Sequence, residues 1–317
     1  SDLKARIVKV ESEKILKDLD EGSIVVVAGF QGVDTDGNIT TLGRGGSDTS
    51  AVALAAGLSA DRCDIYTDVD GVFTTDPRIV AKARKLDRIS YDEMLEMASL
   101  GAKVLQTRSV ELAKKYNVPV RVLSSLEPGT GTLLTGEQNM MEEVVVSSIA
   151  YNRDEAKITI RGVPDTPGVV ATIFGSLADA NVNVDMIIQN TSLDGSETDV
   201  TFTVPRGDYN QAMETLEEPV KRIRAKDLSG NPEIVKVSAI GVGMRSHSGV
   251  AQRMFKALAD ERINIQMIST SEIKVSVVID EKYTELAVRT LHDAFELDKA
   301  HGDNVLGVDE SPTGSVQ

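Results

Sequence analysis

An internal repeat in the second half of the chain limits the possible folds more than any other feature. Residues 168–187 (GVVATIFGSLADANVNVDMI) align without gaps on residues 249–268 (GVAQRMFKALADERINIQMI), at a constant offset of 81 and with nine identities in twenty positions. A match of this kind indicates that one small structural unit is present twice.

The sequence around each copy predicts the order of elements in that unit. The pattern indicates a strand, an amphipathic helix that begins at a glycine, a strand through Asn183 or Asn264, another strand and a second helix. With a final strand, this order is the split βαβ arrangement. The first strand, the later strand and the second helix are predicted at residues 157–160, 198–204 and 209–223 in the first copy, and at residues 235–240, 274–279 and 283–294 in the second.

The stretch TTLGRGGSDTSAVALAAG at residues 40–57 places a glycine-rich turn directly before an apolar helix. The glycines let the backbone approach a ligand closely, and Ser47 or Asp48 can cap the helix. The helix start offers unpaired N–H donors and a partial positive charge, and Arg44 adds a planar guanidinium that suits a carboxylate or phosphate. The stretch therefore predicts an anion-binding cradle, with an ordinary tight turn as the alternative.

The rest of the first half has the pattern of an α/β sheet. Residues 24–28 are a β-branched run, which predicts a strand buried on both faces of a parallel sheet, and residues 5–10 predict a strand remnant. A further strand at residues 64–67 leads into a polar loop. Ligands of open α/β sheets bind beyond the carboxyl ends of the strands, so we expect this loop and the cradle to face one crevice. Ser90 and Glu93 predict a capping box at a helix start.

Composition excludes several classes of function but does not decide the fold. A chain of 317 residues predicts two or three domains. A net charge of −15 and an aromatic content of 4% argue against non-specific binding to nucleic acid or anionic membranes. The single cysteine, Cys63, excludes an intrachain disulfide and is expected to be a small buried hydrophobe. The three histidines have no metal-ligand spacing, so no metal site is predicted. No signal peptide or spanning run is evident, so we expect a cytoplasmic location.

Five motifs together resemble one enzyme family over residues 10–297. They are VAGFQGVD, TTLGRGGSDTSAVALAA, YTDVDGVFTTDPR, EMLEMASLGAKVLQTRSVE and the paired repeats, which end in MISTSEIKVSVV. In combination they look like aspartate kinase, and the repeats look like its two ACT domains. The implied fold class is α/β. Part of a parallel-sheet amino-acid-kinase domain is expected over residues 1–143, followed by two ferredoxin-like βαββαβ ACT domains over residues 144–234 and 235–317, the second with a frayed tail.

The resemblance implies phosphoryl transfer from ATP to the side-chain carboxylate of L-aspartate. The product is 4-phospho-L-aspartate, at the first step of lysine, threonine and methionine biosynthesis. The family motifs imply substrate binding by Arg44, Gly45, Gly46 and Ser47, and catalytic roles for Asp48 and Lys103. They imply that ATP, as its Mg²⁺ complex, is bound by Thr67, Asp68, Phe73, Thr74, Thr75, Asp76, Pro77, Arg78 and Lys103. The competing interpretations are a helix cap for Asp48, an ion-paired surface residue for Arg78 and a solvated helix face for Lys103.

The resemblance also implies feedback inhibition by an amino acid, either lysine or threonine or both. A loop before a helix, with polar groups on an adjacent strand, can hold an ammonium and a carboxylate. The implied effector residues are Asp165, Thr166, Pro167, Gly168, Val169, Val170, Asn183, Val184, Asp185 and Gln189 in the first repeat, and Asn264, Ile265, Ser271 and Glu272 in the second. The alternative is that Gly168 and Gly249 only permit tight turns. Exposed edge strands further predict a homodimer or higher oligomer.

One family motif is absent from residues 1–317. Family members carry K-[FY]-G-G-[ST], whose lysine contacts the transferring phosphate, and this sequence has neither that motif nor a Walker A motif. The chain is therefore expected to lack the first part of the kinase domain and to be inactive alone. This favours a second hypothesis, a non-catalytic regulatory subunit or amino-acid sensor, whereas the GRGGSD and DPR motifs favour the enzyme. A nicotinamide dehydrogenase is a weak third hypothesis, because the cradle lacks G-x-G-x-x-G.

Overall fold

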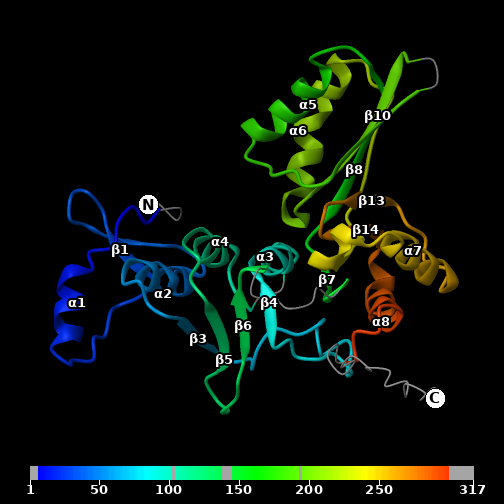
Figure 1. Ribbon diagram of the computed structural model, residues 1–317. Helices are drawn as coiled ribbons and strands as arrows, with labels where there is room; N and C mark the ends of the chain where they lie inside the picture. Colours follow the sequence, from blue (N-terminus) through cyan, green and yellow to red (C-terminus); the bar gives the residue numbers. More distant parts are fainter. Residues whose placement is uncertain (1–5, 102–103, 138–144, 193–194, 300–317) are drawn as a thin grey trace, which may run out of the picture.

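A computed structural model describes residues 6–101, 104–137, 145–192 and 195–299. Within these residues the strands form three four-stranded sheets and one two-stranded sheet, and helices pack against the larger sheets (Figure 1). This confirms the α/β class. None of the described helices has both the length and the apolar character needed to cross a membrane.

The first half of the chain is built on a mixed sheet with the strand order β3-β5-β6-β4. Strands β3 and β5 are parallel, as are β4 and β6, and an antiparallel pairing of β5 with β6 joins the two pairs. Helices α2, α3 and α4 contribute Val52, Met94 and Val110 to its core. The elements of this half are α1 (Glu13–Asp20), β1 (Gln31–Val33), β2 (Ile39–Thr41), α2 (Gly46–Gly57), β3 (Cys63–Thr67), β4 (Arg88–Ser90), α3 (Tyr91–Ser99), α4 (Thr107–Tyr116), β5 (Val120–Ser124) and β6 (Thr132–Thr135).

The predicted capping box at the start of α3 is present. The Ser90 hydroxyl accepts a hydrogen bond from the Glu93 backbone N–H, and the Glu93 carboxylate accepts one from the Ser90 N–H. Cys63 is a buried free thiol, as expected, and burial raises its pKa to about 11. Both predictions rested on local sequence, which is where capping and burial signals are strongest.

The strand predicted at residues 24–28 does not form. Ile24 and Val26 have exposed fractions of 93% and 92%, and no described strand pairs with this run. A β-branched run becomes a strand only when a neighbour satisfies its backbone groups, so its composition alone was misleading. The strand remnant predicted at residues 5–10 is likewise absent over residues 6–10. Helix α1 forms, but none of its residues is buried.

The two repeats fold into equivalent units with equivalent strand orders. The first unit has the order β11-β8-β10-β9, and the second has β7-β12-β14-β13. The first contains β8 (Ala156–Pro164), α5 (Val169–Asp179), β9 (Ile187–Thr191), β10 (Glu197–Val204), α6 (Tyr209–Arg222) and β11 (Asp227–Asn231). The second contains β7 (Ser148–Asn152), β12 (Ile234–Ile240), α7 (Val250–Asp260), β13 (Met267–Thr270), β14 (Lys274–Asp280) and α8 (Thr284–Ala294).

The position of strand β7 does not fit the predicted domain boundaries, which assign residues 144–234 to the first ACT domain and residues 235–317 to the second. It precedes the first unit in the chain, but it pairs with β12 and so belongs to the sheet of the second unit. It takes the position beside β12 that β11 takes beside β8. The first unit is therefore inserted between the first and second strands of the second unit. The strands predicted through Asn183 and Asn264 also begin later, at Ile187 and Met267.

The second unit also contacts the first half of the chain. The Lys274 ammonium lies 2.6 Å from the Glu96 carboxylate on α3, and the Val242 N–H donates to Glu93. The Ile149 N–H on β7 donates to the Thr74 carbonyl in the loop between β3 and β4. This loop, residues 68–87, is called the β3–β4 loop below.

Candidate functional site

The glycine-rich cradle forms the start of helix α2. Gly45 is the N-cap residue, with a left-handed φ of 70°, and Gly43 has a φ of 79°. No side chain caps this helix, so the cap predicted at Ser47 or Asp48 is wrong. A residue with a side chain would be strained at the φ of Gly45, and this explains why the helix begins on a glycine, with Asp48 in its first turn.

The cradle glycines are also required by neighbouring side chains. A Cβ atom on Gly45 would lie 1.9 Å from the Gln106 side chain, and one on Gly46 would lie 2.9 Å from the Phe30 ring. The Arg108 guanidinium donates to the Leu42 carbonyl and ties α4 to the same turn. Packing by the chain itself thus accounts for part of the glycine pattern, in addition to any ligand.

The polar side chains of the cradle lie at different depths. Arg44 and Ser47 are exposed, where a ligand could reach them, whereas Asp48 is partly buried. Burial raises the pKa of the Asp48 carboxyl, and a hydrogen bond from the Gln106 backbone only partly opposes this. The result is an exposed cation and hydroxyl beside a partly desolvated acid, at a helix end that favours anions.

The predicted nucleotide residues follow the end of β3. The Thr67 hydroxyl donates to the Asp68 carboxylate, and Thr74 and Thr75 are buried. Arg78 forms a two-pronged contact with Asp76, at 3.0 and 2.9 Å. These bonds, with one from the Tyr151 hydroxyl, lower the pKa of Asp76 against the opposing effect of burial. The Arg78 side chain is 88% exposed, so the expected surface ion pair is present together with an accessible guanidinium.

Two contacts of this loop were not predicted from the sequence. His292 on α8 lies 2.9 Å from the Thr74 hydroxyl, and Tyr151 on β7 reaches Asp76. Both partners lie in the second unit, and residues 74 and 292 are 218 positions apart. No local pattern could have indicated such a pairing. Lys103, predicted to reach the phosphates of ATP, lies outside the described residues.

The predicted effector residues of the first unit fall into two separate groups. Gly168 caps α5 with a φ of 93°, and Gly249 caps α7 with a φ of 96°, so both glycines are required by their turns. The Asp165 N–H donates to the Ser196 carbonyl, whereas the Asp185 N–H donates to the Thr203 carbonyl. At about 3.3 Å per residue, Ser196, which directly precedes β10, and Thr203 within it are separated by about 23 Å. One amino acid could not touch both groups within this unit.

Other predicted effector residues lie on open surfaces. Asn183 and Val184 line a shallow groove of about 430 Å³ with Phe174 and Ile187. Gln189 is exposed on edge strand β9, which pairs only with β10 among the described strands. In the second unit Asn264 and Ser271 are exposed, Ile265 is partly buried, and Glu272 lies 3.3 Å from the Arg245 guanidinium.

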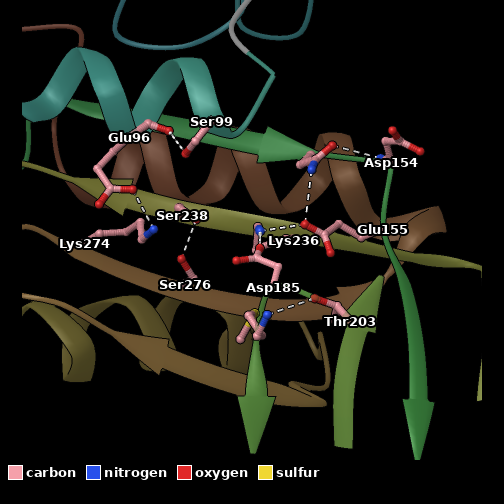
Figure 2. Close-up of polar contacts among 12 residues, drawn as sticks. Glu96, Ser99, Asp154, Glu155, Asp185, Thr203, Lys236, Ser238, Lys274 and Ser276 are labelled. Carbon is pink, nitrogen blue, oxygen red and sulfur yellow. Dashed lines mark hydrogen bonds and ion pairs between the residues drawn. The ribbon is translucent and has the colours of Figure 1, made fainter. Parts of the chain in front are cut away.

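Asp185 already has a partner within the chain. Its carboxylate contacts the Lys236 ammonium, which also lies 2.6 Å from Glu155 (Figure 2). Burial acts to raise the pKa of Asp185, but the hydrogen bond and charge of Lys236 outweigh it and lower that pKa. The ammonium of an effector bound at Asp185 would have to share this carboxylate with Lys236 or displace it.

Comparison with known proteins gives consistent matches. Residues 2–124 match the amino acid kinase family, and residues 158–219 and 237–295 match the ACT domain. The chain is 64% identical over 301 residues to an aspartate kinase of Stutzerimonas stutzeri, and this match covers 95% of the chain and 73% of that protein.

Solved structures agree with these matches. The aspartate kinase of Clostridium acetobutylicum, described as an allosteric enzyme, gives a TM-score of 0.77 at 27% identity and covers 84% of this chain. E. coli aspartokinase III gives 0.72 in complex with aspartate and ADP and 0.70 in complex with lysine and aspartate, at 33% identity over 89% of this chain. The chain spans 62% of the length of each of these solved chains.

Proposed function

This chain belongs to the aspartate kinase family, and we propose from that premise that its gene product transfers the γ-phosphoryl group of ATP to the side-chain carboxylate of L-aspartate. The observation that carries the proposal is the cradle, in which an exposed Arg44 and Ser47 stand at the start of α2 beside a partly buried Asp48. A guanidinium and a helix start suit the carboxylates of a small acidic substrate.

The proposed reaction requires little proton transfer by the protein. The aspartate side chain is an anion at neutral pH, so no base is needed to activate it, and the task is to align two negative groups that repel each other. Arg44 and Ser47 would hold the substrate, and Asp48 would orient the cationic and N–H donors around the phosphates. ATP would lie against the β3–β4 loop, where the Arg78 guanidinium is accessible, and Mg²⁺ bound to the nucleotide would neutralise part of the phosphate charge.

We further propose feedback by lysine, threonine or both through the ACT units. E. coli aspartokinase III has been solved with lysine bound, and this chain carries the same kind of tandem. Because the two effector groups of the first unit lie at opposite ends of its sheet, a complete site needs a second unit or a second chain. This supports a homodimer or higher oligomer, for which exposed edge strand β9 offers unpaired backbone groups. A cytoplasmic location is proposed because aspartate and ATP are available there.

The test is a pair of matched arginine substitutions in the full gene product. Arg44→Ala should raise the KM for aspartate by roughly tenfold to a hundredfold, the loss expected for a charge-assisted hydrogen bond, with little change in the KM for ATP. Arg161→Ala, at an exposed ion pair with Asp227 in the first ACT unit, should leave both constants unchanged. An effect of Arg44→Ala confined to ATP would show that the cradle binds the nucleotide and not the amino acid.

A further inference from the structure

Thr74 is the point at which the β3–β4 loop joins the second ACT unit. Its N–H donates to the Arg84 carbonyl at 2.8 Å, and its hydroxyl accepts from the Arg84 N–H at 3.0 Å, so Thr74 also closes the loop on itself. Its carbonyl accepts from the Ile149 N–H on β7, and its hydroxyl lies 2.9 Å from His292 Nε2 on α8. Thr74 and His292 are 1% and 0% exposed, so water cannot replace either partner.

The same loop is packed into the core of the second unit. Val80 is buried among the side chains of that core, and Ile79 and Ala83 pack against it. The loop therefore belongs to the first half of the chain by sequence but shares its core with β7, α7 and α8. A shift of α8 would be transmitted to the loop through rigid contacts, because close-packed interiors transmit displacement.

His292 is an unusual residue for a purely structural position in this core. Its Nδ1 atom is buried and has no hydrogen-bond partner among the described residues. Burial lowers the pKa of the imidazole, although Asp293 and Asp298 oppose this and Lys82 and Arg84 add to it. Burial thus favours the neutral ring, which shares one hydrogen bond with the Thr74 hydroxyl. An apolar side chain would fill the same space without leaving a polar nitrogen unsatisfied.

We propose that His292 is a positioning residue for the nucleotide: through Thr74 it holds the β3–β4 loop in its ATP-binding conformation. The inference rests on the proposed function, because it takes this loop as the ATP site. Asp76 and Arg78 lie two and four residues beyond Thr74, and the Tyr151 hydroxyl holds Asp76 from the same unit. Loss of the His292 contact would remove one of the two hydrogen bonds that hold Thr74 to the second unit.

The experiment measures ATP binding directly in the full gene product by calorimetric titration with MgATP, and steady-state kinetics alongside. His292→Leu, which loses one buried hydrogen bond, should weaken ATP binding by about threefold to tenfold. Thr74→Val, which also loses the bond from the Arg84 N–H, should weaken it at least as much, while the KM for aspartate stays within twofold in both variants. His292→Gln, whose amide can donate from a similar reach, should restore most of the affinity. The double variant should bind ATP no more weakly than Thr74→Val alone, because Thr74→Val already removes the contact with His292.

The control is Leu258→Ala on α7, which opens a cavity in the same core but removes none of the hydrogen bonds of Thr74. It should lower Tm but leave the affinity for ATP unchanged. Wild-type affinity in folded His292→Leu and Thr74→Val would overturn the proposal, as would an equal loss of affinity in Leu258→Ala or an absence of ATP binding in the wild type. Failure of the proposed function is distinguishable, since it would appear as ATP binding without aspartate phosphorylation.

Discussion

Asp48 shows how one residue can serve the site at a cost to folding. It stands in the first turn of α2, where negative charge is favoured, yet partial burial raises its pKa. A carboxyl whose folded pKa exceeds its unfolded value of about 3.9 is ionised more easily in the unfolded chain. Ionised Asp48 therefore opposes folding, and this cost grows as the pH rises through the interval between the two pKa values.

Asp48→Asn should separate the two effects. We expect turnover to fall by about a hundredfold or more, because a charge that organises the phosphate site is lost at nearly constant volume. At pH 7 the Tm of the variant should equal or exceed that of the wild type, and the difference should shrink at pH 4. Thermal denaturation and steady-state kinetics measure both. Asp92→Asn, in the first turn of α3, is the control for a helix-end charge outside the cradle, where the carboxylate pairs with Lys114, and it should leave turnover unchanged.

The cradle also shows what sequence can predict at the scale of single residues. The glycine pattern placed a turn before α2 correctly, because a left-handed φ leaves a strong residue preference. The cap was assigned wrongly because a glycine N-cap leaves no side-chain signal. The partners of the site, Gln106 at Gly45 and His292 at Thr74, follow from tertiary packing, which a single sequence does not record.

At the scale of elements, strands β8 and β12 carry lysines at equivalent positions that reach across to the other unit. Lys236 on β12 contacts Asp185 before β9 (Figure 2). Lys157 on β8 donates to Gln266 before β13. Met186, Ile234, Met267 and Val278 form a small apolar cluster between the units. The two lysines differ in the charge of their partners. Lys236 also neutralises the carboxylate of Glu155, whereas Lys157 contacts a neutral amide.

The equivalent lysine of the first unit therefore serves as the control for a substitution of Lys236. Lys236→Met should lower the free energy of unfolding by about 3–5 kcal/mol, because it leaves the carboxylate of Glu155, which is 4% exposed, without its cation. Lys157→Met should cost only about 1 kcal/mol, the worth of one ordinary hydrogen bond. Urea denaturation of both variants gives the two values. Equal losses would mean that the buried charge contributes nothing specific and that both lysines act only by packing.

Helices and strands could be predicted from the sequence where the same apolar pattern occurs in both repeats. Strands β10 and β14 and helices α6 and α8 lie within a few residues of their predicted positions, because both copies repeat the same apolar spacing. Residues 24–28 had an equally apolar pattern and form no strand, since a strand depends on its neighbours. The assignment of β7 to the second sheet could not be predicted either, because pairing order is a property of the whole chain.

At the scale of the whole molecule, the second ACT unit connects the other parts. It exchanges lysine contacts with the first unit, and through β7, β14 and α8 it contacts Asp76, Glu96 and Thr74 in the first half. The candidate site, made of the cradle and the β3–β4 loop, is thus in direct contact with an ACT unit, the kind of unit to which we assign effector binding. This arrangement fits an aspartate kinase that is regulated through its ACT units.

Trapping of aspartyl phosphate tests this account most directly. The full gene product is incubated with MgATP, L-aspartate and hydroxylamine, and the acyl phosphate is measured as its hydroxamate. We expect aspartate hydroxamate to form at about 1–100 per second, as for other kinases, and to require both substrates. L-Glutamate, one methylene longer, should give little product, and Asp48→Asn should reduce the rate sharply. A folded gene product that forms no hydroxamate with aspartate, but whose Tm rises with lysine or threonine, would contradict the enzyme and favour a non-catalytic sensor.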